Sequence, residues 1–197
     1  MDNYNKILNI IKKNGGYITT KELNENKINR YFLTKMIERN EIIRISRGYY
    51  GVEDYNADEY YKIISINKKA IFSMSTALYL HNLSDRTPLV FDITVPSYYG
   101  GSLRKNKNVK LYFVNSRLLD LGKIEVNSPY GMKINVYDKE RTICDIIKNR
   151  NNMDKEIFSK AIKKYIKSNN KNLNKLMKYA KELKVETKVR EYMEVIL

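Results

Sequence analysis

The sequence has little of several residue types: one cysteine, one histidine, three prolines and no tryptophan in 197 residues. The single cysteine, Cys144, excludes an internal disulfide and a zinc site built from cysteines. The single histidine, His81, leaves little for a histidine-based catalytic triad. No apolar run approaches the roughly 20 residues of a membrane span. The N-terminus lacks the basic, then apolar, then small residues of a secretion signal. We therefore expect a cytoplasmic protein with no metal, no cofactor and no membrane partner.

The composition is that of a folded protein, with 43% hydrophobic and 11% aromatic residues. The formal net charge of +15 favours a polyanionic partner. This charge is uneven: residues 1–60 carry +1, residues 61–138 carry +6 and residues 139–197 carry +8. The positive charge has a second explanation. An AT-rich genome favours lysine, asparagine and isoleucine, and the sequence is rich in these residues. The position of each charge is therefore more informative than the total.

The first residues predict two helices joined by turns. Residues 2–13 place apolar side chains at helical spacing, and residues 14–16 contain two glycines that end such a helix. Thr19 and Glu22 have the spacing of a capping box at the start of a short second helix. Residues 24–28 then form a turn.

A third helix is predicted from about Arg30 to Arg39, with Asn29 as its N-cap. Leu33, Met36 and Ile37 share one face, which would pack on the first two helices. A recognition helix needs this apolar back together with a polar front that meets base edges, although an ordinary solvent-exposed helix shows the same pattern. An arginine in the first turn can offer a bidentate fork to guanine. The candidate DNA-binding residues here are Asn29, Arg30, Tyr31, Thr34 and Lys35.

A basic β-hairpin directly follows this helix. Residues 42–45 read as a strand, residues 46–48 as a tight turn and residues 49–52 as the return strand. Helix, turn, helix and hairpin in this order are typical of a winged helix-turn-helix, so we predict a DNA-binding domain over residues 1–55. Tyr49 and Tyr50 alternate in direction, so that one packs inward and the other can reach a DNA backbone. The candidate DNA-binding residues of the wing are Arg44, Arg47 and Tyr49.

Four stretches of the chain resemble the abortive-infection AbiEi-type antitoxins. Residues 40–50, NEIIRISRGYY, are similar to the wing of that family, with Asn40 where glycine is usual. Residues 73–85 (SMSTALYLHNLSD), 92–96 (DITVP) and 137–145 (YDKERTICD) are similar to a helix, a strand and a helix start that follow it.

The resemblance implies a transcriptional repressor and antitoxin of a phage-defence system. Such a protein represses its own operon by binding double-stranded DNA at operator repeats upstream. It also counteracts a nucleotidyltransferase-like toxin, without necessarily forming a stable complex with it. The second domain is the natural carrier of the antitoxin effect.

The rest of the chain predicts an α+β fold for the second domain, residues 62–197, after a short linker at residues 53–62. It would hold a small, mostly antiparallel sheet followed by C-terminal helices. Its expected strands cover residues 89–95, 109–114, 123–126 and 132–137.

No catalytic constellation is apparent in this second domain. Gly101 and Ser102 suggest a nucleotidyltransferase turn, but the first acidic residue afterwards is Asp120, and no second acid stands two positions on. Walker and Rossmann glycine patterns are absent too, so we expect no enzyme. We interpret the remaining reactive side chains as packing or ion-pairing residues: His81, Glu140, Arg141, Cys144 and Asp145.

Two groups of cations could form a second, non-specific phosphate-binding surface. A solvated exterior in a lysine-rich protein gives the same pattern. The residues concerned are Arg104, Lys105, Lys107, Lys163, Lys164 and Lys167.

Two other functions remain open. One is a plain winged-helix regulator whose second domain binds a ligand or mediates dimerisation. The other is a nucleic-acid-processing enzyme, which would need acidic residues converging on a cleft.

Overall fold

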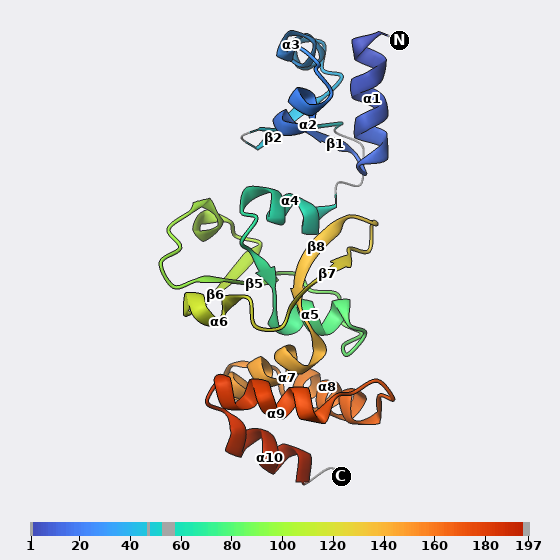
Figure 1. Cartoon of the computed structure of the whole chain (residues 1–197). Coiled ribbons are helices and arrows are strands. Elements are labelled where there is room, and N and C mark those ends of the chain that lie inside the picture. Colours follow the sequence, from blue (N-terminus) through green and yellow to red (C-terminus); the bar gives the residue numbers. More distant parts are fainter. Residues whose placement is uncertain (1, 47, 53–57, 195–197) are drawn as a thin grey trace. The chain divides into compact units, whose positions relative to one another are not determined.

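The computed structural model describes residues 2–46, 48–52 and 58–194. They form two compact units (Figure 1). The first comprises Met1–Lys68 with Asn127–Lys133, and the second Lys69–Val126 with Ile134–Leu197.

The first unit is built from short helices and a three-stranded antiparallel sheet in the order β1-β3-β2. This is the predicted winged helix-turn-helix, with α3 as its recognition helix and the β2–β3 hairpin as its wing (Figure 1). The elements are α1 (Asn3–Lys13), β1 (Tyr17–Thr19), α2 (Thr20–Glu25), α3 (Arg30–Glu38), β2 (Ile43–Ser46), β3 (Tyr49–Gly51) and α4 (Glu59–Ile66).

Short polar side chains set the helix starts of this unit. The predicted capping box is present: Thr19 Oγ1 accepts from the Glu22 amide at 3.1 Å, and Glu22 accepts from the Thr19 amide at 2.8 Å. Asn29 Oδ1 accepts from the Tyr31 amide at 2.9 Å and so caps α3. Asn40 lies in the left-handed region with φ 56°, which explains how it replaces a glycine. The core beneath these helices consists of Ile7, Ile11, Ile18, Leu23, Ile28, Leu33, Met36 and Ile42.

Helix α4 was not predicted. Of the expected linker, residues 53–57 lie outside the described residues, and residues 59–62 form the first turn of α4. Asp58 caps this helix by accepting from the Tyr61 amide at 3.1 Å, and it also accepts a hydrogen bond from Ser128. The helix is stabilised by burial of Tyr60 and Ile63. The polar residues around them weaken the apolar pattern by which the sequence would predict this helix.

The second unit holds a five-stranded sheet in the order β6-β5-β4-β8-β7 and a group of helices. Its elements are β4 (Ile71–Phe72), α5 (Met74–Leu80), β5 (Phe91–Pro96), η1 (Ser102–Lys105), β6 (Val109–Val114), α6 (Ser116–Leu119), β7 (Lys123–Asn127), β8 (Lys133–Tyr137), α7 (Lys139–Lys148), η2 (Arg150–Asn152), α8 (Lys155–Lys167), α9 (Leu173–Glu182) and α10 (Glu186–Glu194).

The α+β fold class is confirmed, but the larger sheet is mixed rather than mostly antiparallel. β4 pairs antiparallel with β5, whereas β4 pairs parallel with β8 and β5 pairs parallel with β6. The connection between β5 and β6 crosses over through η1, which makes that pair parallel. The pairing of β4 with β8 joins segments far apart in sequence, and no local pattern reveals it.

Residues 73–85 and 92–96, two of the stretches that resemble the AbiEi-type antitoxins, are hydrogen-bonded to each other in the core of this unit. The Asp92 amide donates to Thr76 Oγ1 at 2.9 Å, and the Asp92 carboxylate accepts from the Ser75 amide at 2.9 Å. Thr94 Oγ1 donates to Ser73 Oγ at 2.9 Å. These polar residues therefore fix α5 against β5. The carboxyl of Asp92 is buried, and this desolvation raises its pKa.

Candidate nucleic-acid interface

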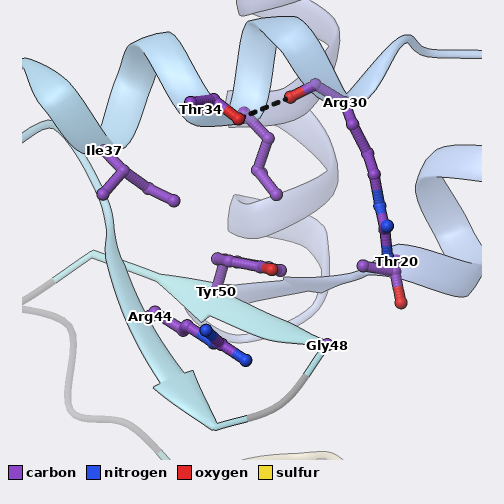
Figure 2. Close-up of a pocket in the computed structure, with 8 residues that line it drawn as sticks. Thr20, Arg30, Thr34, Ile37, Arg44, Gly48 and Tyr50 are labelled. Atoms are coloured by element: carbon purple, nitrogen blue, oxygen red, sulfur yellow. Dashed lines mark hydrogen bonds between the residues drawn. The ribbon is translucent and has the colours of Figure 1, made fainter.

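A groove separates the recognition helix α3 from the wing (Figure 2). It has a volume of about 600 Å³. On α3 the groove-facing positions follow helical spacing at i, i+3, i+4 and i+7, so one stripe of the helix lines it. The lining residues are Thr20, Arg30, Leu33, Thr34, Ile37, Arg44, Gly48 and Tyr50.

Two arginines reach this groove from different elements. Figure 2 shows the side chain of Arg30 extending from α3 towards Thr20, while Arg44 projects from β2. Both arginines are exposed, and neither guanidinium has an acidic partner among the described residues. Thr34 lies one turn after Arg30, and its hydroxyl donates to the Arg30 carbonyl at 3.3 Å. The groove therefore presents two uncompensated positive charges.

The wing is held beside α2 by a backbone contact at Gly48. The Thr20 amide donates to the Gly48 carbonyl at 2.9 Å. Gly48 has φ 82°, which disfavours side chains, and a Cβ atom there would lie 3.1 Å from Thr20 Oγ1. Glycine thus permits both the turn and the close approach.

The polar front of α3 has a second face, formed by Tyr31, Lys35 and Glu38. The Lys35 ammonium lies 2.6 Å from the Glu38 carboxylate and 5.8 Å from the centroid of the Tyr31 ring. The hydrogen bond to Glu38 raises the pKa of Lys35. Tyr31 is 58% exposed. The predicted contacts of the helix are thus divided: Arg30 and Thr34 line the groove, while Tyr31 and Lys35 lie beside it.

The two wing tyrosines lie in different hollows. Tyr50 lines the groove, as the register predicts by pairing it with Arg44 across β2 and β3. The predicted contact residue, Tyr49, lines a separate hollow with Thr19, Glu22 and Tyr61, among others, and its contact with DNA stays a prediction. Arg47 lies outside the described residues. Tyr50 and Thr20 are therefore groove residues that the sequence interpretation missed, and the hairpin register was the signal for Tyr50.

Comparison with known families supports this interpretation of the first unit. Residues 5–52 match the model of a family described as "Transcriptional regulator, AbiEi antitoxin". This segment is therefore similar to the AbiEi antitoxin regulators. The match runs from α1 to the end of the wing and includes the described residues that line the groove.

Most of the chain is similar in fold to a mycobacterial structure, the crystal structure of the RV2827C protein from Mycobacterium tuberculosis. The TM-score is 0.62 at 10% identity, covering 92% of this chain and 72% of that one. At this identity the likeness shows the fold alone. A comparison with curated proteins finds no match.

The AbiEi-like motif at residues 137–145 builds structure rather than a reactive centre. Asp138 caps α7 and accepts from the Tyr179 hydroxyl at 3.1 Å, while the Lys175 ammonium lies 2.8 Å away. Glu140 accepts from the Tyr165 hydroxyl at 3.2 Å and from the Asn172 amide at 3.1 Å. The carboxylates thereby fasten α8 and α9 to the start of α7.

Arg141 is the most enclosed charge of the motif. Its side chain is 2% exposed, and its guanidinium donates to the Leu118 and Leu121 carbonyls at 2.9 Å each. It also bonds both oxygens of Asp145 at 3.1 Å and stacks 4.2 Å from the centroid of the Tyr137 ring. The Nε and Nη1 groups of Arg141 are therefore bound within the fold, which gives this residue a structural role.

His81 and Cys144 are packed residues too. The Tyr137 carbonyl lies 2.7 Å from His81 Nε2, so this nitrogen carries the proton, and burial lowers the pKa of the imidazole. Cys144 is fully buried, which raises the pKa of its thiol to about 12. Within the described part of the chain, no group of three or more His, Cys, Asp or Glu could hold a metal, and no helix is long and apolar enough to cross a membrane.

The predicted second phosphate-binding surface is divided between two separate elements. Arg104 lies in η1, where it donates to the Tyr99 carbonyl at 2.9 Å and stacks on Phe113 at 4.8 Å. Lys164 on α8 pairs with Asp85 at 2.6 Å. The other cations of the two groups are exposed: Lys105, Lys107, Lys163 and Lys167.

Proposed function

We propose that this chain is a transcriptional repressor that binds double-stranded DNA through α3 and the wing. One observation carries the proposal: Arg30 and Arg44, from two different elements, line one groove without acidic partners among the described residues. An exposed arginine without an ion pair is available for a phosphate or a base edge. The match of residues 5–52 to a family of transcriptional regulators supports this function.

Each contact residue has a proposed role. Arg30, in the first turn of α3, reads a guanine in the major groove, with Thr34 beside it. Tyr31 contacts a base or the sugar-phosphate backbone. Arg44 contacts phosphates, as does Arg47 by the sequence prediction. Asn29 holds the helix start, and Lys35 is a weaker contact because Glu38 shares its charge.

The test uses the DNA upstream of the gene. Fluorescence anisotropy would compare the full-length protein, the double variant Arg30→Ala/Arg44→Ala and the control Lys12→Ala/Lys13→Ala. Both doubles lose two positive charges from the first unit, but the control residues lie on α1. We expect the groove variant to lose about 100-fold in affinity, corresponding to about 3 kcal/mol, and the control to change little. Equal losses in both variants would refute a role for the groove.

We further propose that the protein is the antitoxin of an abortive-infection system against phage. In this proposal residues 1–55 bind the repeats upstream of its own operon, and residues 62–197 counteract a nucleotidyltransferase-like toxin encoded beside it. The family match supports the antitoxin class. Co-expression with the neighbouring gene should restore growth that the neighbour alone stops. Failure to restore growth, with operator binding intact, would instead favour a plain winged-helix regulator whose second domain binds a ligand or mediates dimerisation.

A further inference from the structure

The two edge strands of the larger sheet differ in how they are protected. β7 carries charges of both signs, Lys123 and Glu125, as edge strands that avoid pairing commonly do. β6, with the sequence VKLYFV, carries one charge, Lys110, and exposes 48% of Phe113. An edge strand with a single charge and an exposed aromatic residue is less protected against pairing with another strand.

The register leaves backbone groups open on β6. The Phe91 amide donates to the Asn108 carbonyl, and the Ser97 amide donates to the Val114 carbonyl. With the parallel pairing of β5 and β6, the even-numbered residues of β6 therefore face β5. The amide and carbonyl groups of Leu111 and Phe113 consequently point to the open edge.

A hollow of about 390 Å³ lies along this strand. Four consecutive residues of β6, Leu111 to Val114, border it, and α7 and Leu183 form much of its other side. Asp145 lies in the hollow but is neutralised by Arg141. The rest of the lining is mixed. Its apolar and aromatic residues are Met74, Leu111, Tyr112, Phe113, Val114 and Leu183, and its polar residues are Thr94, Arg141, Lys148 and Asn149.

Cations flank both faces of the strand. Arg104 stacks on the Phe113 ring, and the Lys110 ammonium lies 5.4 Å from the centroid of the Tyr112 ring. Successive side chains point to opposite faces of a strand, so these two cations lie on opposite faces. Lys148 lines the hollow and is exposed. None of the three has an ion-pair partner at salt-bridge distance among the described residues.

We propose that β6 is a docking strand for an extended, acidic segment of a partner protein. The segment adds a sixth strand by bonding the free groups of Leu111 and Phe113, as in other cases of strand addition. Its apolar side chains enter the hollow, and its acidic side chains meet Arg104, Lys110 and Lys148. The charge of the surroundings selects an acidic segment over a neutral or basic one.

Because the sequence of the partner segment is not known, binding peptides would be selected from a random library. A phage-displayed library of random decapeptides would be selected on the full-length protein, and the enriched peptides would be synthesised for anisotropy measurements. We expect enriched sequences to alternate apolar and acidic residues. Lys110→Glu/Phe113→Ser should weaken their binding at least about tenfold. The control Lys155→Glu/Tyr130→Ser also reverses the charge of one exposed lysine and replaces one exposed aromatic residue, but on α8 and in the turn between β7 and β8, and should have no effect.

Two further measurements distinguish pairing from simple attraction. Peptide binding should slow hydrogen exchange at the amides of Leu111 and Phe113 but not at Tyr112, and N-methylation of alternate peptide amides should abolish binding. Oligothymidine that displaces the peptides, or dimerisation of the free protein lost in the Lys110→Glu/Phe113→Ser variant, would assign the edge to a nucleic acid or to a second copy. Either outcome, or the failure of any peptide to enrich, would overturn the proposal.

Discussion

The arginines of the first unit and Arg141 of the second have opposite surroundings. Arg30 and Arg44 are exposed, without acidic partners among the described residues, and face an open groove. Arg141 is enclosed by two carbonyls, one carboxylate and one aromatic ring. The difference separates charges that serve a partner from charges that serve the fold, although all three residues are equally conspicuous in the sequence.

The same contrast explains why net charge is a poor guide here. Residues 1–60 carry only +1, yet they contain the groove with two uncompensated arginines. The second unit has a larger excess, but in its motif at residues 137–145 the side chains of Asp138, Glu140, Arg141 and Asp145 are bonded to side chains and backbone groups of the same unit. Substitutions in the two regions should therefore separate binding from stability.

The largest expected effect is on the stability of the second unit. Arg141→Ala would leave the Asp145 carboxylate and two carbonyls without their partner, and should cost about 3–5 kcal/mol. Urea unfolding followed by circular dichroism measures this loss. Arg190→Ala, which removes an exposed pair with Glu186, should cost at most about 0.5 kcal/mol. Similar costs in the two variants would contradict the assigned role of Arg141.

Two capping aspartates provide the next comparison. Asp138→Ala removes the cap of α7 together with the bonds from Tyr179 and Lys175, and should cost about 2–3 kcal/mol. Asp154→Ala removes only the exposed cap of α8 and its surface contact with Arg86, and should therefore cost less. Thermal unfolding of both variants should therefore show a clearly lower midpoint for Asp138→Ala.

In the groove, Arg30→Ala should mainly affect sequence discrimination. If Arg30 makes a bidentate contact with guanine, its loss should reduce the preference for the upstream repeat over unrelated DNA by about 1–3 kcal/mol. Competition binding against single-base variants of the repeat measures this preference. An unchanged ranking of all variants would show that Arg30 reads no base.

Arg44→Ala should act on all sequences alike. Losing one phosphate contact should make the slope of log affinity against log salt shallower by about one unit, without changing the ranking of sites. Salt titrations on the repeat and on unrelated DNA would show this. A change restricted to the repeat would instead make Arg44 a base contact.

The smallest expected effect is a pH dependence from His81. Burial lowers its pKa in the folded state, so protonation favours the unfolded chain. The stabilisation is present above the unfolded pKa, about 6.5, and is lost as the pH falls below it. His81→Gln should flatten the decline of unfolding free energy between about pH 7 and pH 5. If the unfolding free energy of His81→Gln declined as steeply as that of the parent protein, groups other than His81 would cause the decline.

Local features of the fold were predictable from the sequence. The capping box at Thr19 and Glu22, the cap at Asn29 and the hairpin after α3 each depend on residues a few positions apart. The unpredicted features depend on distant partners. Examples are the parallel pairing of β4 with β8, the burial of Tyr60 in α4, and the carbonyls of Leu118 and Leu121 that hold Arg141.

The candidate site shows the same limit. Helical spacing predicted that Arg30 and Thr34 lie on the polar face of α3. It did not show that the Lys35 ammonium would form an ion pair with Glu38. The choice of Tyr49 over Tyr50 depended on which face of β3 meets the groove. The hairpin register places Tyr50 at the groove, whereas the sequence alone does not distinguish the two tyrosines because they are identical neighbours.

The most direct test of the DNA-binding groove is site-specific disulfide trapping. Cys144 is fully buried, so Thr34→Cys would place the one accessible thiol in the groove, and Lys12→Cys would place it on α1 as the control. Each variant would be mixed with upstream DNA that carries a thiol tethered to a base in the major groove, moved along the repeat one position at a time. We predict that Thr34→Cys crosslinks at one or two adjacent positions and Lys12→Cys at none. Equal trapping of the two variants, or trapping of Lys12→Cys alone, would contradict the account.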